Sequence, residues 1–200
     1  MYRLLAIATA IFMLLGLPSA WAFDLSELEA QLRARPIVRG KFVQEKFLRS
    51  LEHPLTSRGT FVLSAGQGLL WRLHTPIAQS LRITPSGIAR QETDGQWRAV
   101  PGHAGSSRES RLFMDVLSGD TKGLQDNFDL ALSGRSDAWQ LTMTPRSALL
   151  KQIFSDITID GDVLVKRIEL RETQGDRSVL QMIEAQNTTL DDEERRAFEH

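Results

Sequence analysis

The chain has 200 residues, with 24 Lys and Arg against 25 Asp and Glu, and it contains no cysteine. The absence of cysteine excludes disulfides and thiolate metal sites. The formal net charge of −1 gives no electrostatic basis for binding nucleic acid.

The first 22 residues have the pattern of an export signal. Arg3 gives a positive start, Leu4–Leu17 is an uncharged apolar run, and Ala20-Trp21-Ala22 supplies a small-x-small cleavage site. The run is short for a membrane span, so a retained anchor is the less favoured alternative. We expect cleavage after Ala22 and export to a periplasm. Residues 23–200 would then form one domain, long enough for a substantial core.

A helix is predicted at the start of this domain. Leu25, Leu28 and Leu32 recur at helical spacing, and either Asp24 or Ser26 can cap the helix. Leu28 and Leu32 are expected to face inward, toward the rest of the domain.

Short β-prone segments separated by Gly- and Pro-containing turns follow, and they indicate a large antiparallel sheet. The predicted strands are 37–48, 55–63, 69–74, 79–84, 88–92, 97–100, 127–132, 138–144, 153–159, 163–173 and 177–186. Strand alternation places six large apolar residues of the first half on one inner face: Phe42, Phe61, Leu63, Leu69, Trp71 and Leu73.

An amphipathic helix interrupts the strands near the middle of the chain. Ser106-x-x-Glu109 forms a capping box, and Gly119 stands at a plausible position after the helix. The inward residues of this helix would be Leu112, Phe113 and Val116. At the end of the chain, Asp191–Phe198 is expected to form a short helix whose acidic start is solvated.

Motifs for catalysis or metal binding are weak. The four histidines show no metal-binding spacing, and there is no G-x-S-x-G nucleophile motif. Asp160-Gly161-Asp162 is better explained as a hairpin turn than as a calcium site. We predict no catalytic residues, no metal and no cofactor. Composition alone favours a filled core over a lined cavity for the apolar face, and alternation cannot separate the two.

Three segments resemble one family, the periplasmic carriers of outer-membrane lipoproteins of the LolA type. Phe42-Val43-Gln44, followed by Gly59 and Phe61, is similar to the family's opening strands. Trp71, before the turn at Pro76, is similar to the family's tryptophan strand. The third segment resembles the family's L-T-P-[KR]…L-K-Q passage and runs from Leu141-Thr142-Met143-Thr144-Pro145-Arg146 to Leu150-Lys151-Gln152.

The resemblance implies an incomplete, strongly curved antiparallel barrel of about eleven strands covered by a helical lid. It also implies a monomeric, non-catalytic carrier. Acyl chains would bind between the sheet and the lid, against the inward residues named above. The partners implied are an inner-membrane ABC-type release complex and an outer-membrane acceptor.

One position departs from the family pattern. Lipoprotein carriers of this type have an arginine before the tryptophan strand that hydrogen-bonds to the lid, and this chain has Ala65 there. Arg58 and Arg72 are the candidates to replace this arginine. Two alternatives therefore stay open: a carrier of a non-protein lipid, acylated or polyene, and a sensor that binds a partner protein through the same fold.

Overall fold

The computed structural model of the chain describes residues 23–100, 114–115 and 119–199. The predicted signal peptide lies outside the described residues. So does most of the predicted lid helix, including Leu112, Phe113 and Val116.

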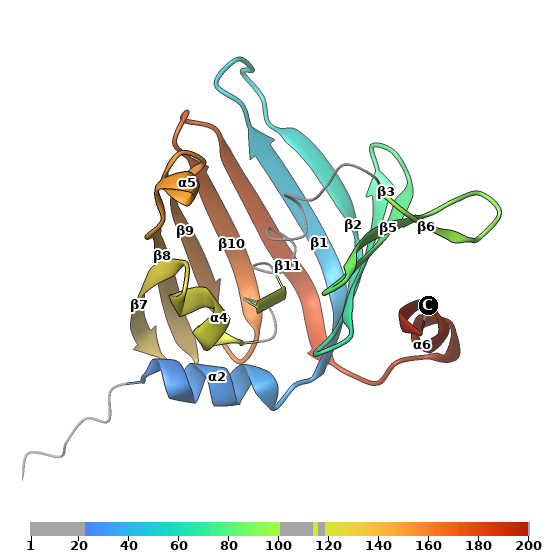
Figure 1. Ribbon diagram of the computed structural model, residues 1–200, viewed down its shortest axis with the longest axis horizontal. Helices are drawn as coiled ribbons and strands as arrows, with labels where there is room; N and C mark the ends of the chain where they lie inside the picture. Colours follow the sequence, from blue (N-terminus) through green and yellow to red (C-terminus); the bar gives the residue numbers. More distant parts are fainter. Residues whose placement is uncertain (1–22, 101–113, 116–118, 200) are drawn as a thin grey trace, which may run out of the picture.

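An eleven-stranded antiparallel sheet forms the body of the protein (Figure 1). Its strand order is β6-β5-β4-β3-β2-β1-β11-β10-β9-β8-β7, so β6 and β7 are the edges and the sheet is not closed. This confirms the predicted incomplete, strongly curved antiparallel architecture. The strands are β1 (Ile37–Phe47), β2 (Leu55–Ser64), β3 (Gly68–Thr75), β4 (Gln79–Thr84), β5 (Gly87–Gln91), β6 (Trp97–Ala99), β7 (Phe128–Arg135), β8 (Ala138–Pro145), β9 (Phe154–Gly161), β10 (Val165–Glu172) and β11 (Arg177–Asn187).

Turn chemistry explains where the observed strands differ from the predicted ones. β7 extends to Arg135, because only Ser136 and Asp137 form the turn into β8, and Gly134, with a φ of +93°, stays paired with Trp139. β10 begins at Val165, because the Asp162 carboxylate accepts a hydrogen bond from the Leu164 N–H at 3.0 Å. The predicted turn at residues 160–162 therefore forms two residues later, at residues 162–164.

The first helix, α2 (Leu25–Arg33), is capped at Asp24, one of the two residues predicted for this role. The Asp24 carboxylate accepts from the Glu27 N–H at 2.9 Å, and the Glu27 carboxylate accepts from the Asp24 N–H at 3.0 Å. Leu28 and Leu32 are its buried residues, as predicted. Figure 1 shows α2 lying across one end of the curved sheet.

Two short helices, α4 (Thr121–Gln125) and α5 (Ala148–Lys151), were not predicted as helices. Each is only about one turn long, so neither shows helical periodicity. The Ser147 hydroxyl caps α5 by accepting from the Leu150 N–H at 3.2 Å. α4 lies beside β7 on the concave side of the sheet, and its Leu124 is buried (Figure 1).

The last helix, α6 (Asp192–Phe198), packs on the opposite, convex face of the sheet. Ala197 contacts Val62 and Leu70, which alternate with the inward residues of β2 and β3. The prediction that the acidic start of α6 is solvated is wrong for one of its residues. Glu194 is only 2% exposed, and Arg39 binds it with two donors, one of them at 3.2 Å.

Farther along the convex face, a nearly buried carboxylate is surrounded by arginines. Glu169 on β10 accepts hydrogen bonds from Arg167 and Arg171 and lies 3.7 Å from Arg177. Burial favours the neutral acid. The hydrogen bond and charge of Arg167, with the charges of Arg171 and Arg177, outweigh burial and lower the pKa of Glu169 below its usual value.

This lowered pKa predicts acid sensitivity. The contribution of Glu169 to stability is fully present above its unfolded pKa of about 4.3 and is lost as the pH falls through the lower folded value. Glu169→Gln should destabilise the protein at pH 7 by about 1–3 kcal/mol and flatten the stability profile below pH 4.3. Urea unfolding at a series of pH values measures both effects. An unchanged acid slope in the variant would contradict this account.

Candidate functional site

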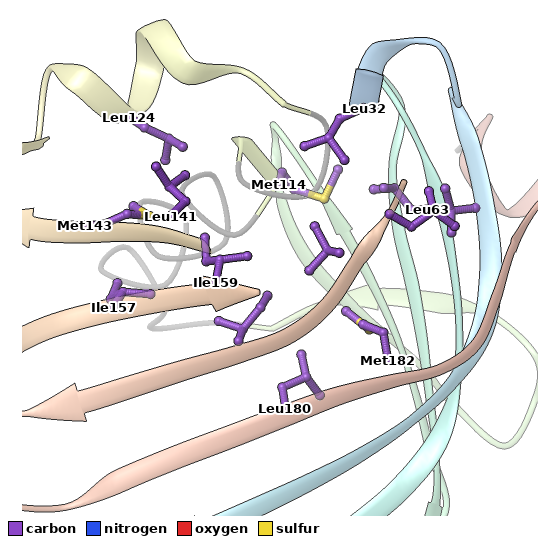
Figure 2. Close-up of a cluster of buried hydrophobic side chains, with 14 of the residues drawn as sticks. Leu32, Leu63, Met114, Leu124, Leu141, Met143, Ile157, Ile159, Leu180 and Met182 are labelled. Atoms are coloured by element: carbon purple, nitrogen blue, oxygen red, sulfur yellow. The ribbon is translucent and has the colours of Figure 1, made fainter. Parts of the chain in front are cut away.

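The concave face of the sheet carries a continuous apolar cluster. It includes every predicted inward residue that the structure describes, with Leu73 half-buried at its margin: Leu28, Leu32, Phe42, Phe61, Leu63, Leu69, Trp71 and Leu73. Figure 2 shows Leu32 of α2 and Leu63 of β2 on one side of this space and Leu124, Leu141 and Met143 on the other. The predicted inner face therefore exists as one surface shared by the sheet and the helices.

A stacked aromatic pair lies within this face. The ring centroids of Phe42 on β1 and Trp71 on β3 are 3.6 Å apart, with an angle of 18° between the planes. The residue between them is Gly59, which is paired with Phe42 across the strands. A Cβ atom at Gly59 would lie 2.7 Å from the Phe42 ring and 2.0 Å from the Arg72 carbonyl oxygen. Gly59 therefore gives the Phe42 ring room to cross β2 and reach Trp71.

Helix α2 is held over the cluster by polar contacts at its sides. The Gln31 side-chain amide donates to the carbonyl oxygens of Asp162 at 2.7 Å and Ser136 at 3.1 Å. The Thr121 hydroxyl donates to the Glu29 carboxylate at 2.6 Å. These contacts tie α2 to the turns after β9 and β7 and to α4, while its leucines face the sheet.

A small cavity lies beneath the C-terminal end of α2, with a volume of about 20 Å³. Its lining is almost entirely apolar and comes from α2, four strands and two connecting segments: Leu32, Val38, Phe61, Leu63, Leu164, Val165 and Met182, with Arg35. The Arg35 guanidinium donates to the Gln31 carbonyl oxygen at 2.7 Å. This cavity is about the size that one water molecule occupies.

The second half of the chain contributes much of the cluster, and the sequence analysis did not assign it to the site. The residues are Phe128, Trp139, Leu141, Met143, Ile157, Ile159, Ile168, Leu180 and Met182. Their alternation along β8 and β9 has the same period as that of β2 and β3. The same parity argument could therefore have found them.

The suggested substitutes for the family arginine are wrong. Arg72 lies on the convex face, where it pairs with Glu193 of α6 at 3.0 Å. Arg58 has the outward parity of Thr60 and Val62 on β2, opposite to that of Phe61. Ala65 lies in the β2–β3 turn, and its N–H donates to the Pro36 carbonyl oxygen at 2.7 Å. Both arginines therefore point away from the concave face.

Across the residues that the structure describes, no group of three or more His, Cys, Asp or Glu side chains is arranged to hold a metal ion. None of the helices within those same ranges has the length and hydropathy that crossing a bilayer requires.

These features define a class of protein: a curved, unclosed antiparallel sheet with helices packed on an apolar concave face. The chain belongs to the family of LolA-like outer membrane lipoprotein carrier proteins, whose model matches residues 17–197. A search of curated protein sequences found no match.

Several solved structures have similar folds. A MucA/MucB complex of Pseudomonas aeruginosa contains a chain with a TM-score of 0.51 and 16% identity, and the match covers 85% of this protein and 59% of that chain. The present chain therefore spans less than two thirds of that relative. A LolA superfamily protein of Nitrosomonas europaea has a TM-score of 0.48 and 10% identity, and the match covers 86% of this protein and 96% of that chain. A lipoprotein-sorting protein domain of Vibrio parahaemolyticus has a TM-score of 0.43 and 9% identity, and the match covers 90% of this protein and 98% of that chain.

The Phe42–Gly59–Trp71 arrangement predicts a costly substitution. Gly59→Ala should destabilise the protein by about 3 kcal/mol, because the added methyl group overlaps backbone that cannot move without disturbing β3. Gly66→Ala is the matched control. Its Cβ would meet nothing within 4 Å, so only the positive φ of +80° opposes it, at about 1 kcal/mol. Equal costs in urea unfolding would contradict the proposed role of Gly59.

Proposed function

We propose that this protein is a periplasmic carrier that shields the acyl chains of outer-membrane lipoproteins during transfer from the inner to the outer membrane. The observation that carries the proposal is the continuous apolar cluster on the concave face of an unclosed sheet, in a member of the LolA-like carrier family. Residues 1–22 would direct export and be removed after Ala22. The carrier has no enzymatic step.

The physical need for such a carrier is clear. Each acyl CH₂ group transferred out of water contributes about 0.8 kcal/mol, so a lipidated protein does not leave a membrane without a shielded apolar site. The concave face offers apolar side chains from both halves of the sheet, and the ion pairs described above lie on the convex face. Acyl chains would contact Phe61 and Leu63 first, because these residues line the existing cavity beneath the end of α2.

Loading requires the covering helices to move. The cavity of about 20 Å³ is far smaller than the ~150 Å³ that holds even a benzene molecule. In the described conformation, Leu28 and Leu32 of α2 pack into the apolar cluster above the sheet, so acyl chains would enter there only if α2 moved. Displacement of α2, together with the predicted lid segment around Leu112, Phe113 and Val116, would expose the site.

The cargo is the point on which the candidate functions differ. Ala65 in place of the family arginine keeps a non-protein lipid, acylated or polyene, as the second candidate. The fold shared with a MucA/MucB complex supports a third, a module that binds a partner protein. A lipoprotein carrier would also need an inner-membrane ABC-type release complex and an outer-membrane acceptor as partners.

Analysis of bound material separates these candidates. When the full-length protein is purified from the periplasm of its native host, mass spectrometry should detect acylated molecules bound to it. Lipoprotein cargo supports the leading proposal, and free lipid supports the second candidate. A stable protein partner without any lipid, or no bound apolar molecule at all, would overturn the carrier proposal.

A charge placed on the concave face should impair binding more than folding. Trp71→Glu is expected to lower the affinity for a fluorescent acyl probe by at least tenfold, because the carboxylate would face the acyl chains. Trp97→Glu, the same change on the convex side, is the matched control and should bind normally. Circular dichroism and urea unfolding measure folding in both variants. Failure of Trp71→Glu to fold would instead assign Trp71 to a permanently filled core.

A further inference from the structure

A second, unassigned hollow lies on the convex face, between α6 and the strands β3 to β6. Its volume is about 600 Å³, within the range of small-molecule sites. It lies across the sheet from the apolar cluster. The strand register explains its composition: Arg72 and Arg82 point outward from β3 and β4, and Trp97 pairs with Gln91 on the next strands. We call this hollow the arginine groove.

The charges of the arginine groove do not balance. Three guanidinium groups line it, from Arg72, Arg82 and Arg196, and the single carboxylate in the lining belongs to Glu193. Glu193 is already 3.0 Å from Arg72. Among the lining residues, two positive charges are therefore left without an acidic partner.

Arg82 is the strongest sign that this imbalance matters. Its residue is only 9% exposed, and its guanidinium lies over the Trp97 ring at 5.2 Å. It donates to the Ala197 carbonyl oxygen at 2.6 Å, and no carboxylate within the described part of the chain pairs with it. Burial lowers the pKa of the Arg82 guanidinium because it removes water from the charged group. A buried cation that lacks a counter-ion is costly, and an anion in the adjoining space would reduce that cost.

We propose that the arginine groove binds a phosphomonoester group. A dianionic phosphate matches the two unbalanced positive charges, and guanidinium groups bind phosphate oxygens in a bidentate manner. The remaining volume would hold the organic part of the ligand against Trp97 and the Gln91 and Gln96 side chains. The same group occurs in soluble phosphate esters and in the headgroups of phosphatidic-acid-like lipids. The site lies on the face opposite to the proposed acyl site and does not depend on the carrier proposal.

Binding is tested with the full chain and two kinds of ligand. Isothermal titration uses inorganic phosphate and glycerol 3-phosphate, and flotation uses vesicles of phosphatidylcholine with or without phosphatidic acid. Binding of the soluble esters identifies a soluble ligand, whereas binding only to vesicles with phosphatidic acid identifies a lipid headgroup. Absence of binding in both assays overturns the proposal.

Substitutions of exposed α6 side chains make the test specific without disturbing the fold. Arg196→Gln should weaken binding about tenfold, the loss expected for one charge-assisted hydrogen bond. Arg195→Gln is the matched control, because this neighbouring arginine pairs with Asp192 and does not line the groove. Glu193→Gln should strengthen binding several-fold by removing the groove's carboxylate. Equal losses in the two arginine variants, or weaker binding by Glu193→Gln, would contradict the assignment.

Discussion

The contact between the Phe42 and Trp71 rings across Gly59 sets the geometry of the concave face. Because Gly59 has no side chain, an aromatic residue of β1 can lie over β2 and stack on β3, which joins three neighbouring strands by one apolar contact. Phe61 and Leu63 extend this surface along β2, and Leu28 and Leu32 of α2 cover it. The spacing of phenylalanine, glycine and tryptophan that resembles the carrier family thus has a direct structural reason.

The two faces of the sheet have different chemistry, and this separation follows from the period of two in each strand. On β3, Leu69 and Trp71 face the concave side, while Leu70 and Arg72 face α6 on the convex side. The concave face is thus apolar, as the proposed carrier function requires. The convex face carries several ion pairs, and the lining of the arginine groove holds three arginines but only one carboxylate.

The sequence predicted the strands, the capped first helix and the inward residues of β1 to β3, because alternation and capping are local properties. It did not predict α4 and α5, because a single turn has no periodicity to detect. Burial of Glu194 was also missed, since its partner Arg39 is 155 residues away in sequence and only the sheet brings the two together. The grouping of Arg72, Arg82 and Arg196 likewise depends on strand register and on where α6 packs. Whether the apolar face is a filled core or a binding wall depends on helix movement, which the pattern of residue types does not encode.

Hydrogen–deuterium exchange with and without a diacylated lipopeptide tests the central claim most directly. The account predicts that lipopeptide changes the exchange of amides in α2 and in β2 and β3, because the helix moves away while acyl chains cover the strands. Amides of α6, on the convex face, should exchange as before. Unchanged exchange throughout α2 and the concave strands, at lipopeptide concentrations that saturate a lipoprotein carrier, would contradict the claim that this face opens to receive acyl chains.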